Sequence, residues 1–514
     1  MVIFGALGSG FRFGFSLTIL NPLAPIAIEL MISTFKKNYN FDLEANPQYI
    51  SWIFGATAGS SAIGSMIGSV TYNFMFNRFG RRTLLIICQV IFVFSSLCGI
   101  ISKYDLYELL VFGEIIAGIS IGYSLGSIST LIMEISEPGM ESFLNSIVPV
   151  CIEMAATGTN LLGIDVILGN STLWQLMFGI ALLISVIAAI GMYFGKESPR
   201  YLIQHGLDEQ AIEAIQYYDY ITSSEAEEKR KVIEASMHEV TKNLSILEVL
   251  KDSQYRRPCL MAACVGEAQL LSGVPAMAIF GTTMLRESGG LDSTRAGVMN
   301  FFLGSSNLVG VTIALFFLAH INHKKLLLIG LPIMAAVNGI YCFSAIYANT
   351  NPQSAVPMYC ICAGYLIFGL AFSNSVEKIC FFNGALITPI EALPATASLS
   401  VFNVTFFAFV VPLIFSVLQA NLPGYAFIPF IVANLLFFVV FLLFYPSEAL
   451  KSPLEEEQAE HECSLSRKNS SQNVDNPSQG IDLMTAIDGE LEKQTEPPSN
   501  QEIPNPEQVD IEEQ

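Results

Sequence analysis

The sequence predicts an all-α membrane protein with twelve transmembrane helices in two bundles of six. Of the 514 residues, 52% are hydrophobic and only 14% are charged, whereas soluble domains contain about 25% charged residues. The apolar residues are gathered in runs of about twenty, the length an α-helix needs to cross a bilayer. A polar stretch divides these runs into six and six.

The twelve runs follow one another along the whole chain up to residue 445. We expect helices near residues 4–31, 49–76, 83–103, 106–133, 143–168, 172–195, 258–286, 295–319, 324–347, 356–384, 387–418 and 423–445. The polar stretch between the sixth and seventh runs is rich in Glu, Lys and Ala, which predicts short amphipathic helices. The expected domains are an N-terminal six-helix bundle (1–203), a cytoplasmic helical linker (204–257), a C-terminal six-helix bundle (258–447) and a tail (448–514).

The tail carries most of the net charge of the chain. From Glu448 onward, 17 acidic and 4 basic residues give −13 of the total −20. Such a segment cannot bury enough apolar surface to fold, so we expect a disordered acidic cytoplasmic tail. The remaining sequence has no basic patch for nucleic acid. The ten cysteines lie mostly inside apolar runs without metal-ligand spacing, and we expect no metal and no cofactor.

Lys and Arg in short loops mark the cytoplasmic side of a membrane protein. They cluster after the second run, in the linker and after the eighth run, three places on one side of the predicted membrane. The residues are Arg78, Arg81, Arg82, Lys229, Arg230, Lys231, Arg256, Arg257, Lys324 and Lys325. We therefore expect a multi-pass protein, most simply of the plasma membrane, with both termini in the cytoplasm and very little leader before the first helix.

Three short segments carry a family resemblance. They are NRFGRR at residues 77–82, ESPRYL at 197–202 and QLLSG at 269–273. In this order, and on twelve predicted helices, they resemble the sugar porter branch of the major facilitator superfamily, which includes the facilitated glucose transporters. The resemblance covers roughly residues 5–447 and implies the major facilitator fold.

The resemblance also implies a gating role for charged residues in the loops. In the family, arginines at cytoplasmic helix ends pair with nearby acids and hold one conformation closed. The matching residues here are Arg78, Gly80, Arg81, Arg82, Glu134, Glu197, Arg200 and Glu391. For any single arginine, a purely topological role remains the alternative.

Several family positions are changed. Glu114 and Glu141 stand where the family has arginines, and Ser398 stands where an arginine is expected after Glu391. Cytoplasmic ion pairs are therefore missing or repulsive, and exposed pairs contribute roughly 0–1 kcal/mol each. We hypothesise a shifted inward/outward equilibrium, which cysteine-accessibility measurements with a family-like outward bias would contradict.

The sugar site implied by the resemblance is also altered. Leu270, Pro275 and Pro149 replace amide side chains of the family. The candidate substrate-binding residues that remain are Gln269, Asn307, Asn403 and the neighbouring Glu267. These side chains either line a polar cavity or bond neighbouring helices to one another.

Ionisable residues inside the membrane are costly and tend to be functional. The predicted helices contain Arg12, Glu114, Glu153 and Glu377 in addition to Glu267. We expect Arg12 to pair with Glu114 or Glu153, and such a pair is structural, binds a charged solute or couples protons.

Together these features predict a secondary transporter and not an enzyme. It would move a small solute through the bilayer by alternating access, with a sugar or polyol as the family default and facilitative transport expected. The alternatives are a non-transporting membrane sensor of the same fold and a proton-coupled carrier of another organic solute. The sequence predicts no oligomeric state.

Overall fold

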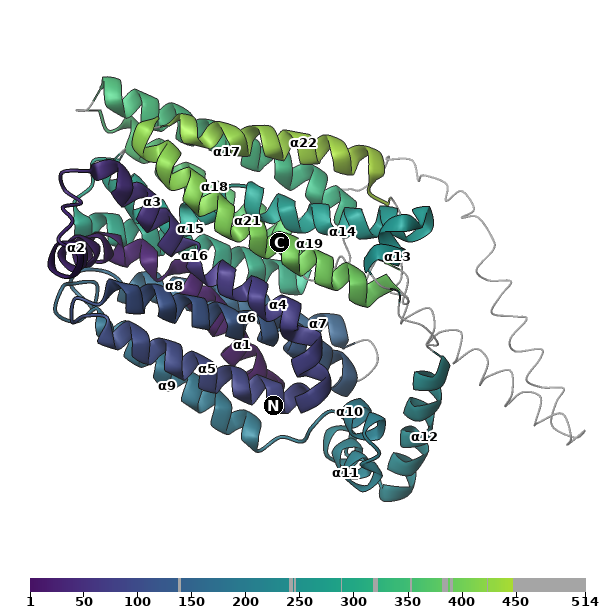
Figure 1. Cartoon of the computed structure of the whole chain (residues 1–514). Helices are drawn as coiled ribbons and strands as arrows, with labels where there is room; N and C mark the ends of the chain where they lie inside the picture. The colour runs from purple at the N-terminus through teal and green to yellow at the C-terminus, as the bar shows by residue number, and fades with distance from the viewer. Residues whose placement is uncertain are drawn as a thin grey trace, which may run out of the picture. The chain divides into compact units, whose positions relative to one another are not determined.

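The computed structural model describes residues 1–136, 140–239, 244, 246–287, 289–317, 322–351, 354–380, 387–388, 392–422 and 424–446. Within these residues the regular structure is helical (Figure 1). The predicted tail from residue 448 lies outside them. The described chain is thus an all-α membrane protein, as the sequence predicts.

The helices of the first half agree with the predicted runs. They are α1 (Val2–Thr18), α2 (Leu20–Tyr39), α3 (Pro47–Ala58), α4 (Ser60–Phe79), α5 (Arg81–Ile101), α6 (Tyr107–Ile135), α7 (Glu141–Asn145), α8 (Ile147–Leu162) and α9 (Gln175–Tyr193). The first predicted run is a pair, because α1 and α2 are bent by 52°. Pro22 explains the bend, since it has no N–H for the Thr18 carbonyl and its ring crowds that carbonyl.

The fifth predicted run, 143–168, is shorter and broken in the structure. It consists of α7 and α8, which are separated at Ser146. Pro149 cannot donate a hydrogen bond to Asn145, four residues earlier, which favours the break at this point. By length and composition, ten helices of the described chain qualify as membrane spans, or eleven with the bent pair. The 16-residue α8 spans about 24 Å, packs against α1 and α16, and completes the twelve-helix arrangement.

The second half begins five residues earlier than predicted, at Ser253. Its elements are α14 (Ser253–Leu271), α15 (Val274–Glu287), α16 (Ser293–Phe317), α17 (His323–Thr350), α18 (Val356–Phe372), the π-helical η1 (Ser373–Glu377), α19 (Lys378–Cys380), α21 (Leu393–Asn421), η3 (Tyr425–Phe427) and α22 (Ile428–Phe444). The seventh predicted run is therefore broken between α14 and α15. The tenth continues from α18 through η1.

Amphipathic helices form in the linker, as its composition predicts. They are α10 (Pro199–Gln204), α11 (Asp208–Asp219), α12 (Ser223–Glu239) and α13 (Ile246–Lys251). Arg230 of α12 contacts Asp208 and Glu234 at 3.0 Å each. Leu202 and Ala214 belong to a small buried apolar cluster of their own. The linker helices thus pack on one another instead of on hydrocarbon.

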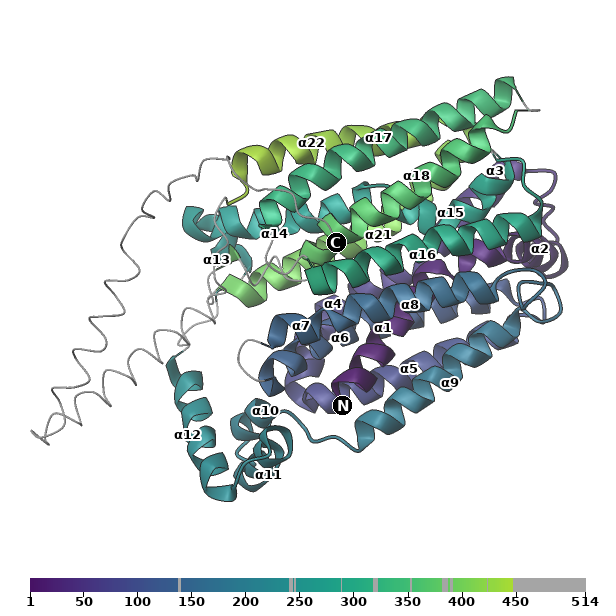
Figure 2. The same ribbon diagram turned by 180° about the vertical axis from the view of Figure 1, so that it is seen from behind.

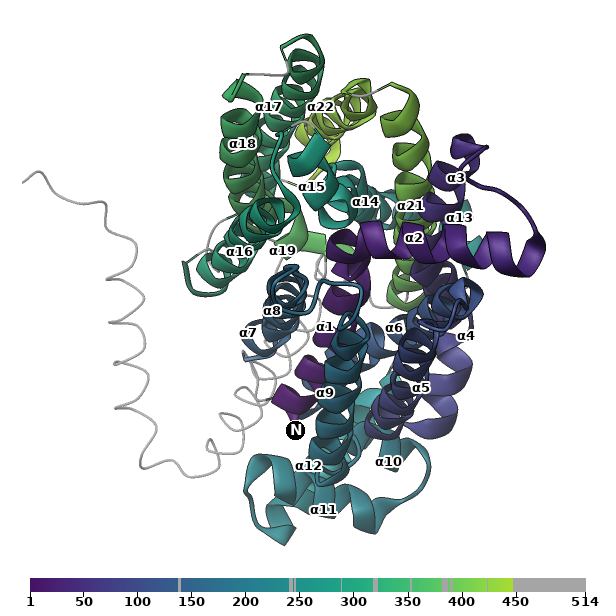
Figure 3. The same ribbon diagram turned by 90° about the vertical axis from the view of Figure 1, so that its left-hand side faces the viewer.

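The helices run alongside one another between two ends of the bundle. We name these the α4–α5 end, where the linker helices α10 and α11 lie, and the α2–α3 end (Figures 1 and 2). Viewed along the helices, α1, α5, α6, α8 and α9 form one group and α14 to α18 with α22 form another (Figure 3). The two halves of the sequence are thus two bundles, and a site between them takes residues from both.

Candidate functional site

A buried ion pair lies at the α4–α5 end of the first half. Arg81 Nε and Nη2 donate to Glu134 at 2.8 and 2.7 Å, and both side chains are only 7% exposed. The Arg81 guanidinium lies 4.0 Å from the centroid of the Phe76 ring, and the Ser198 hydroxyl donates to Glu134. A planar guanidinium fits a carboxylate in this two-point geometry. The pair therefore fastens α5 to α6 and to the segment before α10.

Glu197 completes this cluster by capping α5. Its carboxylate accepts the backbone N–H groups of Arg82 and Thr83 at 2.8 and 3.0 Å. These N–H groups have no partner within the helix, and a negative charge is favourable at a helix N-terminus. Gly80, just before α5, has φ +75°, and an added Cβ would lie 2.8 Å from Glu197 Cδ. Only glycine fits this position without strain.

The other predicted gating residues differ in what they contact. Arg82 donates to the carbonyls of Met192 and Tyr193 at the end of α9, where a cation is favourable. Arg78 is exposed. Arg200 forms no ion pair with any residue that the structure describes. The contacts just described stay within the first half, and Glu391 lies outside the described residues.

The predicted polar residues of the second half are half-buried. Glu267 and Gln269 lie on α14, and Asn403 of α21 donates a hydrogen bond to Glu267. The structure therefore brings Asn403 and Glu267 together across two helices. Leu270, which replaces a family amide, is buried in the core. Pro275 occupies the first turn of α15, where proline is favoured because its missing N–H needs no partner.

Two asparagines that the sequence reasoning missed hold the break between α14 and α15. Asn338 of α17 and Asn434 of α22 both donate to the Ser272 carbonyl, at 2.8 and 3.1 Å. Both side chains are fully buried. Next to them, Gly273 has φ +104°. A lone asparagine inside each of two apolar runs was the available signal, because a buried amide must find a partner.

Glu153, Asn307 and Glu377 meet where the two halves face each other. α8 packs against α16, and the Glu153 carboxyl group on α8 lies within electrostatic range of the Glu377 carboxyl group and of the Asn307 amide on α16. Glu153 and Glu377 are 6% and 3% exposed. The structure thus combines a predicted substrate residue with two predicted intramembrane charges. Asn307 faces this group instead of bonding only within its own bundle.

The expected pairing of Arg12 with Glu114 or Glu153 is wrong. Arg12 is fully buried, and Nε, Nη1 and Nη2 have no hydrogen-bond partner among the described residues. Its guanidinium lies 5.7 Å from the centroid of the Phe92 ring on α5. Glu114 instead faces Ser16, one turn further along α1, and Glu153 faces the second half. The three charges therefore point in different directions from their helices.

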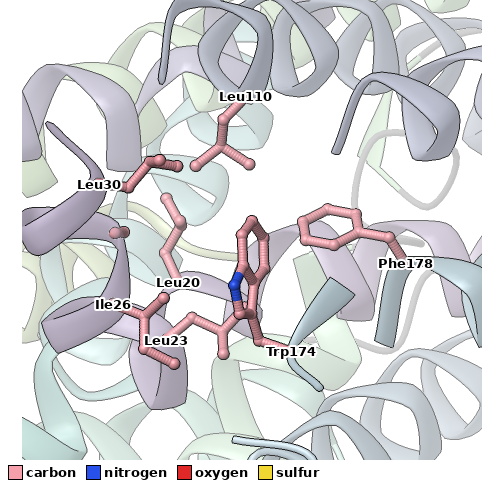
Figure 4. A pocket seen from close by; sticks show the side chains of 8 residues that line it. Leu20, Leu23, Ile26, Leu30, Leu110, Trp174 and Phe178 are labelled. Carbon is pink, nitrogen blue, oxygen red and sulfur yellow. The ribbon is translucent and has the colours of Figure 1, made fainter. Parts of the chain in front are cut away.

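An apolar pocket lies in the first half near the α2–α3 end. It is lined by Leu20, Leu23, Ile26, Ala27, Leu30, Leu110, Trp174 and Phe178. Figure 4 shows the Trp174 indole against these aliphatic side chains. None of the predicted substrate-binding residues lines this pocket. Because its lining is apolar, the pocket offers no hydrogen bonds to the hydroxyl groups of a polar solute.

Several contacts between the halves involve residues toward the α2–α3 end. Asn21 Oδ1 accepts the N–H of Thr282 at 2.9 Å, and Ser416 Oγ donates to the Ser51 carbonyl at 2.9 Å. The Phe54 and Phe280 rings pack edge to face. The two halves are therefore in contact through α2 and α3 of the first half and α15 and α21 of the second.

Comparisons with protein families, with related sequences and with solved structures all match sugar transporters. A family described as "Sugar (and other) transporter" matches residues 1–460. Facilitated glucose transporter member 3 of Oryctolagus cuniculus is 25% identical over 440 residues, 84% of this chain and 86% of that protein. Member 1 of Gallus gallus is 24% identical over 335 residues, 64% and 67% of the two chains. The inward-open xylose transporter XylE from E. coli superposes with a TM-score of 0.71, at 18% identity, over 89% and 98% of the chains.

Proposed function

The chain belongs to the sugar (and other) transporter family, and on that premise we propose that it carries a sugar or a related polyol across a membrane by alternating access. Its relatives are facilitated glucose transporters by name. The fold is that of a secondary transporter, with two helical bundles and polar residues between them. In such folds, solute binds at the interface of the two halves near the middle of the bilayer.

The observation that carries this proposal is the polar contact between the halves. α16 of the second half packs against α8 of the first, and this brings the amide of Asn307 within electrostatic range of Glu153, so polar groups stand where a solute would pass. Gln269 and the Asn403–Glu267 pair supply further donors and acceptors from half-buried positions. A sugar needs several such groups around its hydroxyls, because each buried polar group requires a partner.

Uptake into liposomes containing the purified full-length protein tests the proposal. Labelled hexoses, pentoses, polyols and organic acids are offered separately, and initial rates are measured against concentration. We expect saturable uptake of a sugar or polyol, with a several-fold lower rate for Gln269→Leu. Asn421→Ala is the matched control, since Asn421 is exposed and bonds only its own helix.

The outcomes separate the remaining functions. Saturable uptake of an organic acid, without sugar uptake, favours a carrier of another solute, a reading that Leu270, Pro149 and Pro275 support by replacing amides. Absence of flux for every solute class favours the sensor. Equal rates for Gln269→Leu and wild type contradict the placement of the solute beside α14.

We also propose that the Arg81–Glu134–Glu197 group is a rigid strut at the cytoplasmic end of the first half. Its buried contacts join α5, α6 and the start of the linker, so these elements move together when the halves rock. This assignment puts the α4–α5 end and both termini in the cytoplasm, and the plasma membrane is the proposed location. A cysteine at His205, on the linker surface, should react with an impermeant thiol reagent only after the cells are permeabilised.

A further inference from the structure

Two buried asparagine side chains converge on the break between α14 and α15. Asn338 of α17 and Asn434 of α22 are fully buried, and the amide nitrogens of both donate to the same carbonyl, that of Ser272. α22 packs against both α14 and α17, and these helices lie in the second group of the bundle (Figure 3). Three separate segments of the second half therefore bring polar atoms to one buried point.

The hydrogen bonds fix the orientation of each amide. An asparagine amide has two N–H donors, and Asn338 uses one for Ser272 and one for the Met334 carbonyl, at 2.8 Å each. Asn434 likewise donates to the carbonyls of Ser272 and Phe430, at 3.1 and 2.8 Å. Because all four N–H groups are used, neither amide can be reversed without losing hydrogen bonds. The two side-chain oxygens are therefore fixed as acceptors.

Both of these oxygens lack a hydrogen-bond donor. Asn338 Oδ1 and Asn434 Oδ1 are buried and have no partner among the described residues. Nearly all buried polar atoms in native proteins have a partner. Two unpaired acceptors beside one carbonyl therefore indicate a ligand that needs acceptors only, and a cation is such a ligand.

The backbone at the break adds oxygens and few donors. α14 ends at Leu271, so the carbonyls of its last turn lack the N–H partners that a continuing helix would supply. At the start of α15, the Val274 N–H donates to Ser272 Oγ at 3.3 Å, and Pro275 has no N–H. In transporters with broken helices, such carbonyls and the C-terminal ends of half-helices coordinate sodium.

The charges around the break also favour a cation. The C-terminal end of α14 carries a partial negative charge, and Glu267 stands five residues before Ser272, about 7.5 Å along the helix. The N-terminus of α15 carries a partial positive charge, which the Glu267 carboxylate offsets. The basic residues in the described parts of α14, α15, α17 and α22 stand near helix ends, away from the break: Arg256, Arg257, Arg286, His323, Lys324 and Lys325.

We propose that the break is a sodium site, with Asn338 Oδ1, Asn434 Oδ1 and carbonyl oxygens at the end of α14 as ligands. Calcium is held mainly by carboxylates, and the carboxylate of this region, Glu267, is bonded to Asn403. A Cβ at Gly273 would lie only 2.7 Å from Asn338 Oδ1, so the space beside this oxygen suits a small ion. Cysteine and histidine spacing does not reveal the site, because its ligands are neutral oxygens on three separate helices.

Sodium at this point holds the beginning of α15. Further along, α15 carries Phe280 and Thr282, which contact Phe54 and Asn21 of the first half. The ion therefore steadies the helix that reaches the other half, whichever solute the protein carries. Binding can be tested without any solute.

Thermal unfolding of the purified full-length protein in different salts tests the site. The midpoint is measured in detergent in NaCl, KCl or choline chloride, each at about 150 mM, because a ligand that binds only the folded state stabilises it. For a dissociation constant of about 10 mM, sodium should raise the midpoint by about 3–6 °C relative to choline.

Variants of the two asparagines should lose this sodium response. Asn338→Ala and Asn434→Leu each remove one ligand oxygen and one hydrogen bond to Ser272. The lost hydrogen bond lowers the midpoint equally in every salt, so the difference between NaCl and choline chloride isolates the ion. Asn300→Ala is the matched control, since Asn300 is a buried asparagine of the same half that accepts a hydrogen bond from Tyr365. It should keep the full response.

Binding of radioactive sodium to the wild-type protein requires no variant to fold. We expect saturable binding of about one ion per chain, displaced by NaCl and not by choline chloride. A midpoint no higher in NaCl than in choline chloride, or an equal rise in KCl and NaCl, overturns the proposal. A sodium response that survives in both Asn338→Ala and Asn434→Leu, or that Asn300→Ala also abolishes, overturns it as well. A midpoint independent of the cation, without saturable binding, means that water meets the two oxygens instead.

Discussion

Replacing Glu134 by glutamine should destabilise the first half strongly, although the change adds or removes almost no volume. The Glu134→Gln side chain can still accept a hydrogen bond from Arg81, but the guanidinium is left without its counter-charge at a site only 7% exposed. Removing one partner of a buried ion pair costs about 3–5 kcal/mol. The Phe76 ring, 4.0 Å away, keeps part of the guanidinium's stabilisation, so we expect the lower end of this range.

The expected loss is measurable as a shift in the midpoint of thermal unfolding. One kcal/mol shifts the midpoint of a domain of 150–250 residues by about 2–4 °C, so about 3 kcal/mol in the first half corresponds to roughly 6–12 °C. Tryptophan fluorescence is a suitable readout, since Trp174 is buried in the first half. The purified full-length protein is heated in detergent at neutral pH.

Lys196→Gln is the matched control. It breaks the Lys196–Glu213 pair, whose side chains are 45% and 62% exposed, and exposed pairs contribute at most about 1 kcal/mol. The Arg81→Gln/Glu134→Gln double variant should lose less than the sum of the single changes, because it leaves no unpaired charge. A Glu134→Gln midpoint equal to that of Lys196→Gln, or fully additive single changes, would refute the reasoning.

Two further variants test Gly80, which precedes α5, and the break between α14 and α15. Gly80→Ala should lower the free energy of unfolding by about 1–3 kcal/mol, because alanine is strained at φ +75° and its Cβ would meet the capping carboxylate of Glu197. Unchanged thermal stability would show that the cap is dispensable. In Asn434→Leu, the Ser272 carbonyl loses one of its two amide donors. This variant should therefore reduce thermal stability and transport rate more than Asn421→Ala does. Equal transport rates of the two variants would argue against a role of the α14–α15 break.

The sequence predicted the fold because its strongest signals are local. A run of hydrocarbon length forms a helix wherever it lies, so the positions of most spans agree with the structure. The loop motif was also informative, because Arg81 pairs with Glu134 and Gly80 lies against Glu197, and both acids belong to the same family pattern. Breaks inside a run were harder to predict. The helix breaks at Ser146 and between α14 and α15 depend on proline positions and on hydrogen-bonding side chains in other helices.

The contacts of the candidate site were predicted less well, for a physical reason. The sequence shows that Glu153 and Glu377 lie within apolar runs, but only the packing of α8 against α16 shows that Glu153 faces the second half. Asn338 and Asn434 likewise bond a carbonyl on a distant segment. The direction of a side chain depends on how its helix is rotated about its own axis, and small differences in packing decide this rotation. The apolar pattern of a membrane helix specifies the rotation only weakly, because lipid and protein core are both apolar.

Arg12 gives the sharpest test of how this chain manages charge inside the bilayer. Its guanidinium is fully buried without a counter-charge in the described structure, a situation that costs several kcal/mol. Arg12→Met should therefore raise the thermal midpoint or leave it unchanged, whereas Arg81→Met should lower it, because Arg81 has a partner. If Arg12→Met is stable but carries solute several-fold more slowly, the guanidinium acts in another step of the transport cycle, where it finds an anionic partner. A clear loss of stability in Arg12→Met would mean that the guanidinium has a stabilising partner in this conformation, and the interpretation of Arg12 as an unpaired charge would be wrong.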